Sequence, residues 1–577
     1  MAFDGYVMAA VTAELKEKII TGKIVKIYQP EKHMVVLRIR KGTENFQLLI
    51  SAHPVTGRIH FSAQPKENPL QPPLFCMVLR KHLEGGRISS IEQKGLERVL
   101  HIQVDAFDEI GEQAKKLLVV EIMGKHSNMV LVDPKDGTIL DGIKRYSHLV
   151  SRHREILPGR EYLAPPDQNK LDALKTDEEE FRSTLLSLSL NTKVKNAIVN
   201  RFSGFSPLLA QEVICRAQLP DGVMIDVLGD YELIRLWQAM QEIIFAVNKH
   251  DFHPTVAQSP EKLLDFSCVQ LLQFNPEHLQ EFPYMSAALD YFFSRQEEEE
   301  LFAARQRELL KVVKTEMDRV EKKLSLQMDK LRETEDMEQL RLWGELITAH
   351  IYQLSKGMET AELDNFYQPG ERIRIPLNPH YSPSENAQTY FKKYNKAKSS
   401  KILVEEQVAK NREELDYLYS VGSFLEQART LKDLEEIRSE LVDAAYLKEK
   451  AQIKKGKAKE PVSQPLSFTS QEGYTILVGK NNKQNDLLTL KMAQKDDLWL
   501  HTKNIPGSHV IIRRQPGQEI PFATMEEAAK LAAFYSKARY SSQVPVDYTL
   551  VSQVKKPNGA KPGMVIYFEQ KTLYVTP

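Results

Sequence analysis

Two long heptad stripes constrain the fold of this chain more than any other feature. Apolar residues recur at alternating spacings of three and four in both, which is the pattern of helices that pack along one seam. The first comprises Leu310, Val313, Met317, Val320, Leu324, Gln327 and Leu331, and the second Tyr394, Ala397, Lys401, Val404, Val408, Asn411, Leu415 and Leu418. The stretch between them contains Pro369-Gly370 and IRIPLNPHYSPS. We therefore predict an antiparallel coiled-coil hairpin over 286–450 with a small, partly β tip at about 350–385.

The segments before the hairpin differ in period. Residues 1–170 alternate in a pattern that predicts eight short strands between Ile24 and Asp133, with helices at 4–20 and 72–84 and Asp4 as a possible N-cap of the first. Residues 171–285 show helical spacing without a clear strand, which predicts a small all-helical domain. A multidomain α+β protein follows from this order.

The segments after the hairpin return to strand-like patterning. Residues 451–465 (AQIKKGKAKEPVSQP) predict a basic linker. Residues 466–577 predict a separate α+β module built around one helix at about 524–540.

The composition of the chain excludes several classes of protein. Lys plus Arg and Asp plus Glu both number 78, so any RNA-binding surface has to arise from segregated charge. Three widely spaced cysteines support neither a disulfide framework nor a zinc site. No apolar run is long enough to span a membrane and no export signal is visible, so we expect a cytoplasmic protein.

Basic residues at three places in the first domain are candidates for binding RNA phosphates. They are Arg80, Lys81 and His82 at the end of a helix, the Glu97-Arg98 pair, and Lys125 and His126 after Gly124. Cations at a helix C-terminus are also favoured by the helix dipole, which gives Arg80–His82 a purely structural alternative.

The last module contains a second group of candidates. A polar loop carries Lys480, Asn481, Asn482, Lys483, Asn485 and Asp486, and a later segment carries Trp499, His501, Lys503 and His509. Trp499 and His501 should share one strand face, where an aromatic ring beside lysines could stack on unpaired bases. Residues 471–577 carry 14 Lys or Arg against 9 Asp or Glu. The alternative is that Trp499 is core and the loop is a turn.

A helical hairpin is predicted at Phe202–Ala210, where Gly204 permits a tight turn and Pro207 suits a first helical turn. Gly204 and Ser206 could present this hairpin to a phosphate, although a plain helical corner explains the pattern equally well. No phosphate loop, HExxH or GxSxG motif occurs, so we expect no catalytic residue, metal or cofactor.

Several longer motifs carry a family resemblance. They are FDG near the N-terminus, FCMVLRKHL, EIMGKHSNMVLVD, GKNNKQND and DLWLHTKNIPGSHV. With them the chain resembles the RqcH/NEMF (NFACT) family of ribosome-associated quality-control factors, once labelled fibronectin-binding proteins. The resemblance covers essentially the whole chain. It implies a glycosylase-like N-terminal domain (1–170), a helix-hairpin-helix domain (171–285), the coiled coil and a C-terminal RNA-binding domain (466–577).

The resemblance also implies the function. Such proteins bind large ribosomal subunits obstructed by peptidyl-tRNA, contact rRNA and recruit tRNA, in bacteria tRNA-Ala. Alanine is then added without a template to the C-terminus of the nascent chain, which marks it for degradation. The ribosomal peptidyl transferase centre forms the bonds, so the protein is an elongation scaffold and not an enzyme, assisted by the small RNA-binding partner RqcP.

One departure from the family pattern falls at Glu97, where the family has an aspartate before the arginine. Because charge and acceptor chemistry are kept, we expect tailing to be retained. Two other functions remain as alternatives. A DNA-repair glycosylase would need a proline after the initiating methionine, where this chain has Ala2, and a cysteine zinc finger. A surface adhesin would need export.

Overall fold

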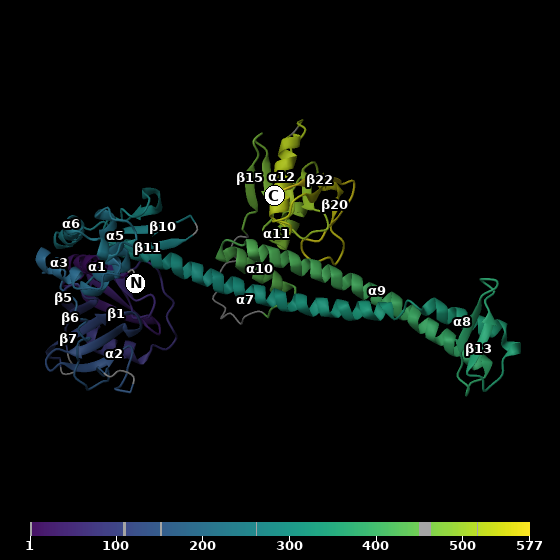
Figure 1. The fold of residues 1–577 in the computed structure, drawn as a ribbon, viewed down its shortest axis with the longest axis horizontal. Coiled ribbons are helices and arrows are strands. Elements are labelled where there is room, and N and C mark those ends of the chain that lie inside the picture. The colour runs from purple at the N-terminus through teal and green to yellow at the C-terminus, as the bar shows by residue number, and fades with distance from the viewer. Residues whose placement is uncertain (1–2, 108–110, 150–152, 261, 449–462, 516) are drawn as a thin grey trace. The chain divides into compact units, whose positions relative to one another are not determined.

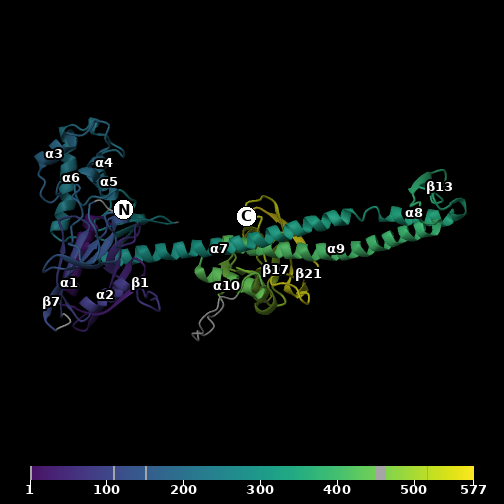
Figure 2. The ribbon, with the colours of Figure 1, turned by 90° about the horizontal axis from the view of Figure 1, so that it is seen from below.

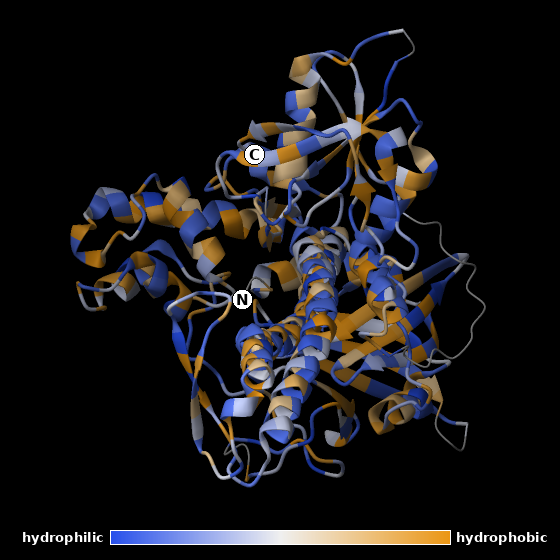
Figure 3. Ribbon diagram, turned by 90° about the vertical axis from the view of Figure 1, so that its right-hand side faces the viewer, coloured by the Kyte–Doolittle hydropathy of each residue, from blue (hydrophilic) through white to orange (hydrophobic). Residues whose placement is uncertain are grey.

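The computed structural model describes residues 3–107, 111–149, 153–260, 262–448, 463–515 and 517–577. They form two compact units, residues 1–299 and 300–577 (Figure 1). Each unit is described by itself below. Figure 3 shows long hydrophobic stretches in the strands of both units, whereas the long helices alternate between hydrophobic and hydrophilic residues.

A nine-stranded antiparallel sheet forms the first domain, in the order β4-β3-β2-β1-β5-β6-β7-β8-β9. The strands are β1 (Lys23–Glu31), β2 (Met34–Lys41), β3 (Glu44–Ser51), β4 (Arg58–Phe61), β5 (Arg87–Gln93), β6 (Val99–Phe107), β7 (Gln113–Glu121), β8 (Asn128–Asp133) and β9 (Thr138–Gly142). The eight predicted strands are confirmed. The ninth, β9, was not predicted because it is short and ends in Asp-Gly, which is typical of turns.

Two helices pack on this sheet, as predicted. Helix α1 (Gly5–Ile19) begins after Asp4, whose carboxylate accepts hydrogen bonds from the backbone N–H groups of Tyr6 and Val7. Helix α2 (Leu74–Leu83) is fixed to β1 because the Arg80 Nε donates to the carbonyl of Ile27 at 2.8 Å. The sheet and both helices enclose one apolar core.

The next segment contains strands as well as helices, so the expectation of an all-helical domain at 171–285 is wrong. Its helices are α3 (Glu178–Leu186), α4 (Val194–Arg201), α5 (Pro207–Arg216) and α6 (Asp230–Asn248). A three-stranded sheet follows, in the order β11-β10-β12, with β10 (Thr255–Gln258), β11 (Leu263–Ser267) and β12 (Leu279–Glu281). Strands of three to five residues are too short for a period-2 pattern to stand out from neighbouring helices.

The predicted antiparallel coiled coil is present. Helix α7 (Met285–Arg332) begins in the first unit and continues into the second, where α9 (Pro383–Gln427) lies beside it (Figures 1 and 2). Gln306 contacts Leu425 whereas Gln327 contacts Gln407, so the helices run in opposite directions. Ser382 and Glu385 form a capping box that starts α9.

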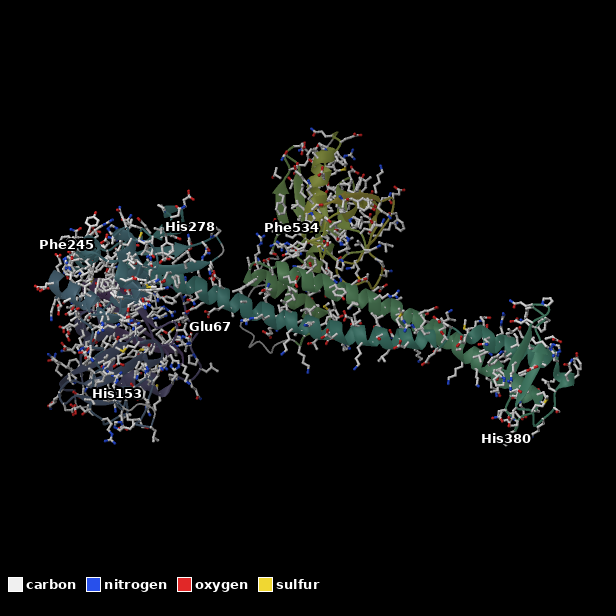
Figure 4. The ribbon with its side chains drawn as sticks, viewed as in Figure 1. Glu67, His153, Phe245, His278, His380 and Phe534 are labelled. Atoms are coloured by element: carbon white, nitrogen blue, oxygen red, sulfur yellow. The ribbon has the colours of Figure 1, made fainter. Side chains whose placement is uncertain are left out.

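The tip is partly β, as predicted, and has its own small core. It consists of α8 (Met337–Ala349), β13 (Thr360–Asp364) and β14 (Arg372–Pro376), and His380, labelled in Figure 4, follows it. A further helix, α10 (Leu431–Asp443), packs against α9 at the other end of the hairpin. The predicted linker lies outside the described residues up to 462.

The C-terminal module is a six-stranded sheet in the order β15-β16-β18-β17-β19-β22 with a two-stranded β20-β21 sheet. Its strands are β15 (Leu466–Thr469), β16 (Thr475–Val478), β17 (Leu498–Thr502), β18 (Val510–Ile512), β19 (Val544–Leu550), β20 (Val554–Lys555), β21 (Ile566–Tyr567) and β22 (Lys571–Val575). The predicted helix is α12 (Phe522–Phe534), whose alanines pack on the sheet. The segment predicted as a loop instead contains α11 (Asn482–Leu487), capped by Asn481, because an asparagine N-cap satisfies the free N–H groups of a short helix.

Candidate nucleic-acid interface

A cavity of about 210 Å³ in the first unit brings together predicted residues that are far apart in sequence. Its lining includes Asp4, Glu97, Arg98, Gly204 and Ser206. The N-terminal FDG motif, the Glu97-Arg98 turn and the hairpin before α5 therefore meet at one place.

Asp4 holds two sides of this cavity together. One oxygen of its carboxylate caps α1, and the other accepts a hydrogen bond from the Ser206 hydroxyl at 2.6 Å. Burial raises the pKa of Asp4 to about 6, against the lowering effects of the Ser206 and Val7 hydrogen bonds. The charged carboxylate is therefore kept in the fold at an energetic cost.

Glycine is required where the two backbones meet. The Gly5 N–H donates to the Gly204 carbonyl at 3.1 Å, and a Cβ on Gly5 would lie 1.9 Å from the carbonyl oxygen of Leu96. Gly204 has a φ of 86°, a conformation that favours glycine. This close approach explains the glycine of the FDG motif and the glycine at position 204 of the hairpin.

Glu97 and Arg98 occupy the turn between β5 and β6. Gln93 Nε2 fixes this turn by donating to the carbonyls of Gly5 and Glu97, both at 2.9 Å. The Glu97 and Arg98 side chains are half-buried. Burial lowers the pKa of Arg98, and the charge of Asp4 opposes that shift.

Lys125 and His126 lie on a neighbouring segment. The Ile122 N–H donates to the carbonyl of Arg98 at 2.9 Å, which places the strand end before Lys125 beside the Glu97-Arg98 turn. Lys125 and His126 are exposed and neither lines the cavity, although Met123 does. Lys170, which the sequence prediction missed, also lines it. It follows a proline-rich stretch without a motif that would have singled it out.

Arg80, Lys81 and His82 do not line this cavity. They lie in the last turn of α2, where the helix dipole favours cations, and a phosphate contact by these three residues stays a prediction. Arg80 is bonded to Ile27, and its guanidinium lies 5.8 Å from the ring centre of Tyr28.

The Ser206 side chain has a structural role in the hairpin. It is buried, donates to Asp4 and accepts from the Leu209 N–H at 3.2 Å as the N-cap of α5. A phosphate contact at this hairpin remains a prediction, and it would have to use groups other than this hydroxyl.

Trp499 and His501 share one face of β17, as predicted, with ring centres 5.7 Å apart and nearly parallel. His509 packs edge-on against both rings. However, Trp499 is 0% exposed and belongs to an apolar cluster with Leu488 and Ile511. The ring is therefore core in this fold, which matches the alternative named for it, and burial lowers the pKa of His501 to about 4.

The polar segment before and within α11 faces α9 and α10. Asn481 donates to Glu436, Asn482 to Ser420 and Glu440, and Lys480 to Asp433. Lys483 pairs with Asp443 at 2.5 Å. Asn485 is buried and bonds to the Gly507 carbonyl and the His509 N–H, and Asp486 pairs with Lys556. Lys480, Asn481, Asn482 and Lys483 thus join the module to α9 and α10, whereas Asn485 and Asp486 bond within the module.

Exposed candidates in the module lie elsewhere. Lys503 is exposed and lies 3.9 Å from Asp547. The sequence prediction missed a cation between two rings after α12, where the Arg539 guanidinium lies 4.1 Å from the ring centre of Phe534 (labelled in Figure 4) and 5.6 Å from that of Tyr540. Tyr540 is 93% exposed. The alternation of aromatic and basic residues in FYSKARY was the available signal.

Comparisons with known proteins agree on the class of protein. A family model described as NFACT N-terminal and middle domains matches residues 4–460, and one described as NFACT protein RNA binding domain matches 464–567. The Rqc2 homolog RqcH of Bacillus subtilis is 42% identical over 581 residues, covering 100% of this chain and 98% of that protein. RqcH of Streptococcus suis is 37% identical over 580 residues with the same coverage.

A solved structure titled as the fibrinogen binding protein from Staphylococcus aureus matches with a TM-score of 0.43 and 31% identity, covering 51% of this chain and 99% of that one. Among the described residues, no helix is both long and apolar enough to cross a bilayer.

The chain is thus a multidomain α+β protein that ends in an RNA-binding domain. It belongs to the RqcH/NEMF (NFACT) family of ribosome quality-control factors.

Proposed function

We propose that this protein binds large ribosomal subunits obstructed by peptidyl-tRNA, recruits tRNA-Ala and supports untemplated alanine tailing of the stalled chain. The observation that supports this proposal most is the cavity where Asp4, Glu97, Arg98 and the Gly204 turn meet, in a chain of this family. The protein acts as a cytoplasmic scaffold without a cofactor, and the ribosome forms the peptide bonds.

Within the cavity, Arg98 and Glu97 offer complementary groups to a tRNA. A guanidinium in a partly enclosed site favours a phosphate or the acceptor edge of a base, and a carboxylate accepts hydrogen bonds from base amino groups. Lys125 and His126, exposed on the neighbouring segment, extend this contact toward the backbone of the same tRNA.

The test is alanine tailing in cells that lack their own copy of the protein. Wild type and Glu97→Asp should both tail stalled chains, because both keep the carboxylate. Arg98→Ala and Glu97→Gln should lose tailing while the protein remains folded and ribosome-bound. Absence of tailing by the wild-type protein would refute the proposal.

The RNA partners can be identified independently. Affinity purification of the tagged protein followed by RNA sequencing should recover large-subunit rRNA and one enriched tRNA species. Recovery of bulk RNA without such enrichment would contradict the proposal. RqcP should be present in the same purification.

For the C-terminal domain we propose that Lys503, Arg539 and Tyr540 contact RNA. Lys503 and Tyr540 are supported by their exposure, and the half-buried Arg539 is supported by its place beside the Phe534 and Tyr540 rings. Trp499, His501, His509, Asn485 and Asp486 are assigned to holding the domain's own structure. Lys480, Asn481, Asn482 and Lys483 are assigned to joining the domain to α9 and α10.

Two finer statements about the fold are also proposals. The nine-stranded sheet with α1 is assigned to a glycosylase-like N-terminal domain, and α4, the Gly204 turn and α5 to a helix-hairpin-helix motif. The backbone hydrogen bond between Gly5 and Gly204 supports a shared RNA-binding site of the sheet domain and the hairpin, because it brings both into the lining of one cavity.

A further inference from the structure

Strands β1, β2 and β5 carry a group of exposed cations, here called the basic face: Lys23, Lys26, Arg38, Arg40 and Arg87. Strand register pairs Lys23 with Arg40 on one side and with Arg87 on the other, and it pairs Lys26 with Arg38. Directly paired residues point to the same side of a sheet with Cβ atoms about 5 Å apart. The five cations therefore form two rows on one face.

The neighbouring strands do not neutralise these rows. Beyond β2, Arg38 is opposite Gln47 and Arg40 is opposite Asn45, both neutral amides. In the row of Arg40, Lys23 and Arg87, the next strand places an acidic residue, Asp105, opposite Arg87. Asp105 itself accepts a hydrogen bond from Ser89.

The internal partners of the arginines are neutral as well. Arg38 lies 5.1 Å from the ring centre of Tyr28, Arg40 donates to the Gly42 carbonyl, and Arg87 donates to the Thr21 carbonyl. Within the part of the chain that the structure describes, none of the five forms an ion pair.

Like charges directly opposite each other destabilise a sheet. Two such rows in a chain with a net charge of zero are therefore not a consequence of an overall basic composition. An arrangement that costs stability in the free protein is favoured when a polyanion occupies the face. Arg38 and Arg40 are two residues apart on one strand, about 7 Å, so the face presents closely and regularly spaced cations.

A groove adjoins the basic face and has suitable chemistry. Lys26 and Arg38 line a space of about 770 Å³ together with Lys18 and Tyr284, and the Lys18 ammonium lies 3.4 Å from the Tyr284 ring centre. Two carboxylates also line this space: Glu14 pairs with Lys18 at 3.2 Å, and Asp290 accepts hydrogen bonds from the Ser62 hydroxyl and the Ala63 N–H. Lys26 and Arg38 thus extend the basic face to the edge of a concave surface, which fits a nucleic-acid backbone better than a flat membrane.

We propose that the basic face is a second RNA-binding site, separate from the Glu97-Arg98 cavity, which binds the phosphate backbone without regard to sequence. The proposal rests on the proposed function only in that both take RNA as the partner. Its role is general affinity for rRNA or tRNA backbone, while the cavity provides selection.

The test uses the full-length protein and a fluorescent RNA hairpin of arbitrary sequence, titrated at several KCl concentrations. In Lys26→Gln/Arg38→Gln, affinity at low salt should fall about tenfold or more. The slope of log K against log salt should become shallower by about 2, roughly one for each cation removed. A second hairpin of different sequence should give the same losses.

A thermal scan gives a readout of opposite sign. Removing the opposed cations relieves repulsion, so the Tm of the double variant should rise by about 1–3 °C. A variant that simply misfolds would lower it. Lys135→Gln/Lys249→Gln is the matched control, because it removes the same charge from exposed lysines outside the face and should change neither slope nor Tm.

Three outcomes would overturn the proposal. The slope could remain unchanged, the control could lose as much as the test variant, or phosphatidylserine vesicles could require the two cations while RNA binding does not. Failure of the quality-control proposal looks different, because the wild-type protein would then not tail stalled chains, while Lys26→Gln/Arg38→Gln would still make the salt slope for an arbitrary hairpin shallower by about 2.

Discussion

Replacing Asn482 tests whether the GKNNKQND segment joins the C-terminal module to the helices beneath it. Asn482 is 3% exposed. Its Nδ2 donates to the Ser420 hydroxyl at 2.8 Å and to Glu440 at 2.9 Å, and its Oδ1 accepts from Ser420 at 3.2 Å. Glu440 is 1% exposed, and burial raises its pKa. Asn482→Ala therefore removes the main compensation for a buried carboxyl group.

The cost follows from these partners. A buried polar group left unsatisfied costs about 1–3 kcal/mol, and more when it is charged. With Ser420 and Glu440 both affected, we expect Asn482→Ala to weaken docking by about 2–4 kcal/mol. The matched control is Lys483→Ala, whose pair with Asp443 is largely exposed and contributes at most about 1 kcal/mol.

Hydrogen exchange measured by mass spectrometry is the suitable assay, because it reports the opening of each helix of a multidomain chain separately. Amides of α10 and α11 should exchange about 30- to 700-fold faster in Asn482→Ala, since each 1.4 kcal/mol is about tenfold. Those of α1 should not change. Equal exchange in Asn482→Ala and Lys483→Ala would refute the docking role.

Three more perturbations concern buried polar groups. Burial raises the pKa of Asp4 from 3.8 to about 6, so the folded chain binds a proton at this carboxylate more tightly than the unfolded chain does. The local stability of α1 should therefore rise by up to about 3 kcal/mol as the pH falls from about 7 toward about 4. Exchange of α1 amides, corrected for the intrinsic pH effect, should show this gain in wild type and not in Asp4→Asn. Trp499→Phe should leave RNA affinity within about twofold, measured by anisotropy, because the ring is buried and its Nε1 has no hydrogen-bond partner among the described residues. In the wild type, the side-chain carbonyl of Gln327 accepts a hydrogen bond from Asn411 at 2.7 Å in the seam of the coiled coil. Asn411→Leu leaves this buried carbonyl without its partner, so Asn411→Leu/Gln327→Leu should have a higher Tm than Asn411→Leu alone.

The sequence predicted the parts of the fold that repeat over long stretches. Heptad spacing predicted α7 and α9, and alternation predicted eight strands of the first sheet, because each pattern had many residues to establish its period. It missed β10, β11 and β12, which have three to five residues each, and it missed α10. Motif recognition does not supply such elements, because their stability comes from tertiary packing.

The residues of the candidate site could be predicted from local patterns, but their arrangement could not. FDG, Glu97-Arg98 and Gly204 were each singled out by local pattern, but only the fold shows that they meet in one cavity. A motif by itself does not say whether its side chains are exposed. Trp499 and the amides of α11 have the composition of an RNA surface, yet they are buried among partners from their own unit.

The Asn482→Asp variant distinguishes the two roles that the buried amide of Asn482 can have, which are docking onto α9 and α10 and direct contact with RNA. An aspartate keeps the size of the side chain but cannot donate, so it would place a second carboxylate within hydrogen-bond distance of Glu440. If the segment acts in docking, Asn482→Asp should be at least as damaging to α10 and α11 protection as Asn482→Ala. Protection should recover in Asn482→Asp/Glu440→Gln, because the amide introduced in place of the Glu440 carboxylate can donate to the new aspartate. If the segment instead contacts RNA directly, Asn482→Asp should leave the protection of both helices unchanged, and RNA affinity should fall equally in the single and double variants.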